Sequence, residues 1–128
     1  MYRMILVDDE PQIRRGLEGL IPWEDYGIEL VGEADNGVSA KILIERVRPD
    51  IAIVDIRMPQ MDGLQLLAQA KELTCCPKFI MLSGFDQFDY VRTAMRLGAK
   101  NYLLKPVDPE ELKAAVIDVA SVLDEEAQ

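Results

Sequence analysis

The stretch I-A-I-V-D-I-R-M-P-Q-M-D-G, residues 51–63, decides the fold of this chain. It begins with four apolar residues, Ile51 to Val54, that are mostly β-branched and are bounded by turn-forming or charged residues. Such a run predicts a β-strand that is buried on both faces. The run ends on Asp55, and Pro59 and the Asp62-Gly63 pair then predict a loop before the next helix. The sequence therefore places a carboxylate where a central strand leaves the core.

Length and composition limit the classes of protein that this chain can be. Its 128 residues suit one domain with a single core, and 49% apolar with 29% charged residues is a globular composition. No apolar run approaches the roughly 20 residues of a membrane span, and acidic residues begin too early for a secretory signal. We therefore expect a cytoplasmic protein that does not contact a membrane.

The charged and metal-binding residue types narrow the function further. The formal net charge of −9, from 23 acidic and 14 basic residues, argues against nucleic-acid binding by this domain itself. The chain has no histidine, and so lacks the commonest general base and a frequent zinc ligand. Cys75 and Cys76 are adjacent, which suits loop packing in a reducing compartment and no redox role.

Strand and helix patterns alternate five times along the chain. The predicted strands are Met4–Val7, Ile28–Ala34, Ile51–Val54, Phe79–Leu82 and Asn101–Leu104. The predicted helices begin near Pro11, Asn36-Gly37, Leu64, Gln87 and Pro109. Helical spacing predicts that Leu20 is buried with the first helix and Met95 with the fourth. This alternation predicts an α/β fold with a doubly wound parallel sheet.

Polar residues stand at the ends of four of these strands. Asp8 and Asp9 follow the first, Asp55 ends the third, Ser83 follows the fourth and Lys105 the fifth. Because parallel strands all end at one edge of a sheet, these side chains are expected to converge there. Each has an ordinary explanation by itself, as a turn residue, a helix N-terminal acid or a solvated charge. Their joint placement favours a functional site.

The chemistry of this cluster points to phosphoryl transfer. Three carboxylates in one cleft need a compensating cation, and oxygen ligands without histidine or thiolate favour Mg²⁺. A carboxylate is a competent nucleophile toward phosphorus, and a metal with one lysine supplies the charge neutralisation that the transfer needs. The residue set therefore predicts an aspartate that accepts a phosphoryl group with Mg²⁺.

Four motifs carry a resemblance to a known family. D-D-E at 8–10, I-V-D-I-R-M-P-Q-M-D-G at 53–63, L-S-G at 82–84 and Y-L-L-K-P at 102–106 resemble the receiver domain of two-component response regulators. The resemblance covers about residues 3–122 and implies a flavodoxin-like fold with strand order 2-1-3-4-5 and five helices. It also implies a sensor histidine kinase as partner, and a regulator that catalyses only its own phosphorylation and dephosphorylation.

The resemblance assigns the acceptor and the metal ligands. By it, Asp55 is the phosphoacceptor and a ligand of Mg²⁺. Asp9 and Asp8 hold the metal as well, Asp8 through a water molecule. The main-chain carbonyl of Arg57 is a further ligand.

The resemblance also assigns the residues that carry the signal. Ser83 and Lys105 contact the phosphoryl oxygens, the Lys105–Pro106 peptide is cis, and Tyr102 is an aromatic switch. The surface expected to change on phosphorylation combines the fourth helix, the fifth strand and the fifth helix. This face is expected to contact either the output domain or a second receiver, which would form a homodimer. The residues of this face are Asp89, Arg92, Arg96, Tyr102 and Lys113.

A finer resemblance concerns the rest of the protein. Residues 21–37 and 83–91 look like receivers of regulators with a C-terminal AraC-type DNA-binding domain. We expect residues 1–123 to be the receiver, residues 124–128 to begin a linker or tail, and DNA to be contacted only through a domain missing here. The alternative is a stand-alone receiver that acts through protein contacts.

Three other classes are disfavoured. A haloacid-dehalogenase-type phosphatase needs a second acid two residues after the nucleophile, where this chain has Arg57. A pseudo-receiver would be expected to lose part of the acidic cluster. A flavin-binding domain of the same topology would need a Ser/Thr/Gly-rich phosphate loop after the first strand, where this chain has D-D-E-P.

Overall fold

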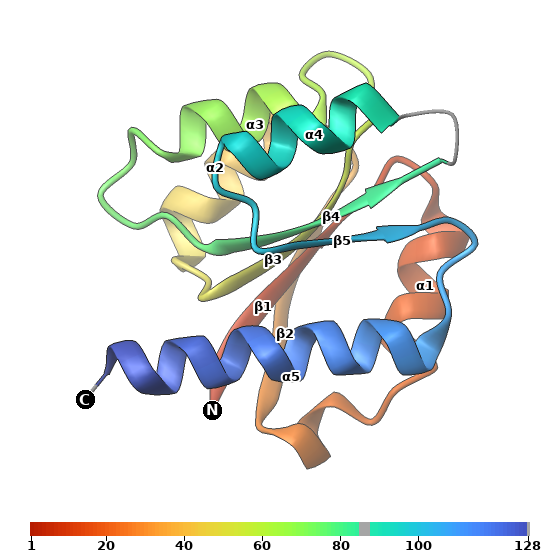
Figure 1. Ribbon diagram of the computed structural model, residues 1–128, viewed down its shortest axis with the longest axis vertical. Coiled ribbons are helices and arrows are strands. Elements are labelled where there is room, and N and C mark those ends of the chain that lie inside the picture. The colour runs from red at the N-terminus through yellow and green to blue at the C-terminus, as the bar shows by residue number, and fades with distance from the viewer. Residues whose placement is uncertain (85–87, 128) are drawn as a thin grey trace.

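Five parallel strands form one sheet in the order β2-β1-β3-β4-β5 (Figure 1). The computed structural model describes residues 1–84 and 88–127. The strands are β1 Tyr2–Val7, β2 Ile28–Ala34, β3 Ile51–Asp55, β4 Lys78–Ser83 and β5 Asn101–Leu104. The helices are α1 Pro11–Gly19, α2 Gly37–Val47, α3 Gly63–Ala70, α4 Phe88–Arg96 and α5 Pro109–Glu126, with a 3-10 turn η1 at Trp23–Tyr26. This arrangement confirms the predicted flavodoxin-like fold.

Alternating side chains of the central strands build two cores, one on each face of the sheet. On β3, Ile51 and Ile53 face α1 and α5, whereas Ala52 and Val54 face the layer of α2, α3 and α4 (Figure 1). All four are fully buried, which explains why this strand has no polar position before its last residue. Asp55 is therefore delivered to the sheet edge by a strand that has no freedom to shift its register.

Local signals fix the helix that follows β3. Asp62 accepts a hydrogen bond from Gln65 N, and the Gln65 side chain accepts one from Asp62 N, which is a reciprocal cap at the start of α3. A Cβ atom at Gly63 would lie 2.4 Å from the main-chain oxygen of Asp55, so only glycine fits there. The Asp62-Gly63 pair thus holds α3 directly against the end of β3.

Two predicted burial positions are wrong. Leu20 is 62% exposed because α1 ends at Gly19, one residue earlier. Met95 is 42% exposed because α4 buries only the narrow stripe of Val91 and Ala94 against the sheet. The helical periodicity was correct in both cases, but the width of the buried stripe is set by the neighbouring elements.

The C-terminal helix extends beyond the predicted domain boundary. α5 runs to Glu126, so the boundary at residue 123 falls inside the helix. The Tyr2 hydroxyl donates to Asp124, and Lys78 pairs with Glu126, which ties the last turns to the sheet. Gln128 and residues 85–87, including the predicted helix start at Gln87, lie outside the described residues. Within the described ranges, no helix has the length and apolar character needed to cross a membrane.

Candidate functional site

Asp8, Asp55, Ser83 and Lys105 lie together at the edge where the parallel strands end. Asp55 and Ser83 are the last residues of β3 and β4, and Asp8 and Lys105 directly follow β1 and β5. Main-chain bonds tie neighbouring ends together: Ile56 N donates to Leu82 O at 2.9 Å, and Lys105 N donates to Ser83 O at 2.8 Å. The Lys105–Pro106 peptide is cis. The sequence-based expectation that these residues converge is therefore correct.

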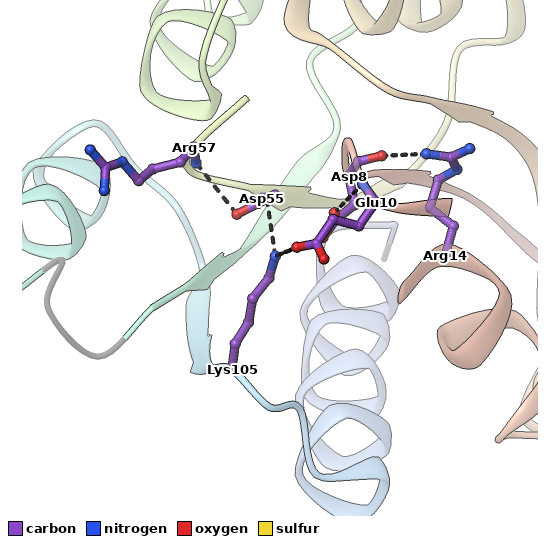
Figure 2. A network of polar contacts seen from close by, with 6 residues as sticks. All are labelled: Asp8, Glu10, Arg14, Asp55, Arg57 and Lys105. Atoms are coloured by element: carbon purple, nitrogen blue, oxygen red, sulfur yellow. Dashed lines mark hydrogen bonds and ion pairs between the residues drawn. The ribbon is translucent and has the colours of Figure 1, made fainter. Parts of the chain in front are cut away.

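The ammonium group of Lys105 forms ion pairs with both buried carboxylates of this edge, those of Asp8 and Asp55 (Figure 2). Lys105 Nζ donates to Asp55 Oδ2 at 3.0 Å and lies 3.0 Å from Asp8 Oδ2. Glu10 Oε1 is farther from the same nitrogen, at 3.8 Å. Asp8 and Asp55 are only 1% and 4% exposed, so water contributes little to their stabilisation.

Burial raises the pKa of Asp55 to about 6, because the charged carboxylate is poorly solvated there. The hydrogen bond from Lys105 opposes this increase, and the nearby Asp8 adds to it. For Lys105, burial lowers the pKa, but the hydrogen bond to Asp55 and the ion pair with Asp8 raise it more, so the net change is upward. The lysine is therefore a fixed positive charge, whereas Asp55 is a carboxylate that would gain from a further cation.

The donor set of the β1–α1 turn fits Mg²⁺. Ligand atoms of Asp8, Asp9 and Glu10 lie within 4.8 Å of one another, and Asp9 and Glu10 are exposed. Asp8 Oδ1 accepts a hydrogen bond from Glu10 N at 2.9 Å. Asp8 Oδ2 is buried and, in the part of the chain that the structure describes, receives no aligned hydrogen bond, since its contact with Lys105 is an ion pair only. A hard cation prefers a site of this kind, where a carboxylate oxygen without an aligned hydrogen-bond donor lies beside two exposed acids.

Sequence reasoning missed two participants at this edge. Glu10 was quoted in a motif but not counted as a possible ligand, although its adjacency to Asp8 and Asp9 was a usable signal. Arg14 donates from its guanidinium to the main-chain oxygen of Asp8 (Figure 2). It also forms a 2.8 Å ion pair with Glu33 on β2. No sequence pattern predicts these two contacts, because Arg14 lies on a helix and its partners lie on two other segments.

The remaining predicted residues have more varied environments. Ser83 is fully buried, and its hydroxyl has no hydrogen-bond partner among residues 1–84 and 88–127. Tyr102 on the edge strand β5 is 43% exposed. The main-chain nitrogen of Arg57 lies 3.4 Å from Asp55 Oδ1, while its side chain extends away from the carboxylate cluster (Figure 2). Ser83 therefore has an unused hydroxyl group, and the Tyr102 side chain is in contact with solvent.

Comparison with known sequences gives a consistent result. A family model described as the response regulator receiver domain matches residues 4–117. An uncharacterized transcriptional regulatory protein of Bacillus subtilis, YesN, is 40% identical over 123 residues, covering 96% of this chain and 33% of that protein. The transcriptional regulatory protein HptR of Staphylococcus aureus is 37% identical over 129 residues, covering 100% of this chain and 50% of HptR. The chain thus spans a third to a half of the length of these relatives.

Solved structures give the same picture. The REC domain of AraT, a response regulator from Geobacillus stearothermophilus, superposes with a TM-score of 0.92 at 40% identity, covering 99% of this chain and 98% of that one. A two component transcriptional regulator AraC from Clostridium phytofermentans superposes with a TM-score of 0.90 at 32% identity, covering 100% of both chains. The similarity therefore extends over the whole chain in both sequence and fold.

Proposed function

Because the chain belongs to the family of response regulator receiver domains, we propose that it is a phosphorylation-dependent switch whose phosphoacceptor is Asp55. The observation that carries the proposal is the shared position of Lys105 Nζ, 3.0 Å from both Asp55 Oδ2 and Asp8 Oδ2, at the end of the central strand. A buried nucleophilic carboxylate and a fixed cation are held there by main-chain geometry, before any ligand arrives.

The chemical step follows from these groups. An oxygen of Asp55 attacks the phosphorus of a phosphohistidine on a sensor histidine kinase, the P–N bond breaks, and the imidazole keeps the electron pair and takes up a proton. The product at Asp55 is an acyl phosphate. Lys105 neutralises charge on a phosphoryl oxygen, and the hydroxyl of Ser83, which has no partner among the described residues, is a second donor at the same edge.

Asp8 and Asp9 would hold Mg²⁺, with Asp55 and the main-chain carbonyl of Arg57 as further ligands. Bound there, Mg²⁺ supplies the charge neutralisation that lets an anionic phosphoryl group approach an anionic carboxylate. The buried Asp8 oxygen without an aligned donor supports this assignment. Glu10 extends the acidic cluster, and as an exposed residue it is free to hydrogen-bond metal-bound water.

An apolar groove beside the acceptor is the docking site that we assign to the kinase. It has a volume of about 170 Å³ and combines one side of α1 with the turn after β5. Its lining residues are Ile13, Gly16, Leu17, Leu20, Lys105, Pro106 and Val107. Lys105 belongs to both the groove and the acidic site, so a kinase segment seated on exposed Leu20 would lie beside the residue that pairs with Asp55.

The signal is proposed to leave through the face formed by α4, β5 and α5. Ser83 turns toward the phosphoryl group, and Tyr102, which is 43% exposed, moves inward. This changes the surface around Asp89, Arg92, Arg96, Tyr102 and Lys113, where a second receiver or an output domain binds. The greater length of the transcriptional regulators HptR and YesN supports an output domain beyond this chain.

Intact-mass measurement after incubation with acetyl phosphate tests the acceptor. The parent chain should gain the mass of one phosphoryl group only when Mg²⁺ is present, and Asp55→Asn should gain none. Asp25→Asn is the matched control, because Asp25 is an exposed acid on η1. Mg²⁺-dependent labelling of Asp55→Asn at another residue would refute the assignment.

The signalling step has a separate test. Ser83→Ala should still be phosphorylated at Asp55, but should lose most of the amide chemical-shift changes on α4, β5 and α5 when beryllofluoride is added. Shifts confined to the loops around Asp9, Asp55 and Lys105 in the parent chain would show that this face does not carry the signal.

A further inference from the structure

The main chain of Asp8 is held from two sides at the point where β1 leaves the sheet. Its N–H donates to Ala34 O at 3.1 Å, which is the last main-chain bond between β1 and β2. Its carbonyl oxygen lies beyond that pairing and accepts from the guanidinium of Arg14 (Figure 2). Because Asp8 is 1% exposed, this carbonyl would otherwise be a buried acceptor with poor access to water.

The guanidinium of Arg14 is itself held in place. Its Nε donates to Glu33 Oε1 at 2.8 Å, and the arginine side chain is 17% exposed. Glu33 belongs to the edge strand β2 and pairs in register with Leu6 of β1. One planar group therefore connects α1, the end of β1 and strand β2, using two of its donors in fixed directions.

We propose that Arg14, fixed by Glu33, is a positioning residue for the magnesium site. It acts through the main chain of Asp8, and so sets where the Asp8 and Asp9 carboxylates stand before the metal binds. The inference rests on the proposed Mg²⁺ site and adds a residue to which neither the motifs nor the family match assigned a role. Groups behind the ligands commonly change metal affinity by about tenfold or more.

The charge of Arg14, considered by itself, has the opposite effect on Mg²⁺ affinity. A cation near the acidic cluster repels Mg²⁺, so removing its charge should tighten metal binding. Loss of positioning should weaken binding instead. The sign of the change in Mg²⁺ affinity therefore separates the two roles.

The experiment is titration of the metal-free chain with Mg²⁺ by calorimetry, for the parent and three variants. Arg14→Met should raise the Kd about tenfold. Arg14→Lys keeps the charge but loses the two-pronged geometry, and should also raise the Kd, by a smaller factor. Arg15→Met is the control, because Arg15 is exposed on the same helix and forms no ion pair with a described residue. Its Kd should stay the same or fall slightly.

Phosphorylation by acetyl phosphate across a Mg²⁺ series provides the second readout. For Arg14→Met, the Mg²⁺ concentration at half-maximal rate should rise, while the rate at saturating Mg²⁺ matches the parent. An unchanged or lower Kd would overturn the inference, as would a lower saturating rate accompanied by a lower Tm, which indicates a general structural role. A parent chain that fails to bind Mg²⁺ would instead refute the proposed function.

Discussion

The two edges of the sheet treat acidic side chains in opposite ways. At the edge where the strands begin, two acids of α5 each have a donor of their own: Asp124 accepts from the Tyr2 hydroxyl, and Glu126 pairs with Lys78 at 2.9 Å. At the edge where the strands end, one ammonium group, that of Lys105, is shared by Asp8, Asp55 and, at a longer distance, Glu10. The first edge is also where the two termini lie (Figure 1).

This difference shows which charges are structural and which are poised for a ligand. The acidic side chains of the pairs at the starting edge are exposed, and such pairs contribute little to stability. Asp8 and Asp55 at the other edge are buried with too little positive charge, so the folded state carries an electrostatic cost there. An added cation would lower that cost, which supports the proposed Mg²⁺ site at this edge.

Removing the shared cation should have the largest effect. Lys105→Met leaves the buried carboxylates of Asp8 and Asp55 without their ion-pair partner, and should lower the free energy of unfolding by about 3–4 kcal/mol near neutral pH. Urea denaturation without metal measures this, and saturating Mg²⁺ should restore much of the loss. Lys100→Met, which removes an exposed lysine just before β5, should change little. Equal losses in both variants would contradict the comparison.

Neutralising Asp55 should raise the free energy of unfolding instead of lowering it. The pKa of Asp55 is about 6 in the folded chain against an ordinary 3.8, so the folded state binds the proton more tightly than the unfolded chain does. This proton binding stabilises the fold fully below pH 3.8, and the stabilisation is lost as the pH rises through 6. Above that range, Asp55→Asn should be more stable than the parent by about 2–3 kcal/mol in the absence of metal. The measurement is the difference in unfolding free energy between the two chains from acidic to neutral pH. A difference that does not grow with pH would contradict the burial argument.

A smaller pair of changes compares the backbone at the two edges. Gln60, in the loop after the acceptor, has φ of 68°, and Arg48, which ends α2 at the opposite edge, has φ of 49°. Side chains with a Cβ atom are disfavoured in this left-handed region, so Gln60→Gly and Arg48→Gly should each raise stability by about 1 kcal/mol. Thermal unfolding detects changes of this size. Loss of stability in either variant would mean that the side chain contributes more than the backbone strain costs.

The smallest effect is expected from the ion pair at the starting edge. A double-mutant cycle with Lys78→Met and Glu126→Gln should give a coupling energy of about 0.5 kcal/mol, since Glu126 is 51% exposed. The coupling should fall further in high salt. A value as large as the effect of Lys105→Met would remove the distinction between the edges.

Much of the site was predictable from the sequence, for a specific physical reason. Apolar runs of the right length fix which residues form strands, and parallel strands must all end at one edge. Asp8, Asp55, Ser83 and Lys105 stand at strand ends in the sequence, so their convergence follows from connectivity alone. The flavodoxin-like strand order came from the resemblance to receivers, since apolar patterns do not state which strands are neighbours.

The tertiary structure decided what the long side chains reach and what the helices cover. That Lys105 touches Asp8 as well as Asp55, and that Arg14 meets the Asp8 carbonyl, depends on distances between segments and on flexible side chains that sequence spacing does not encode. The exposure of Leu20 and Met95 depends in the same way on where neighbouring elements stop. Sequence alone determined which strand ends bear the reactive groups, because alternation and burial are local properties of the chain. Only the packed structure determined how those groups share charge, because charge sharing is a property of distances in space.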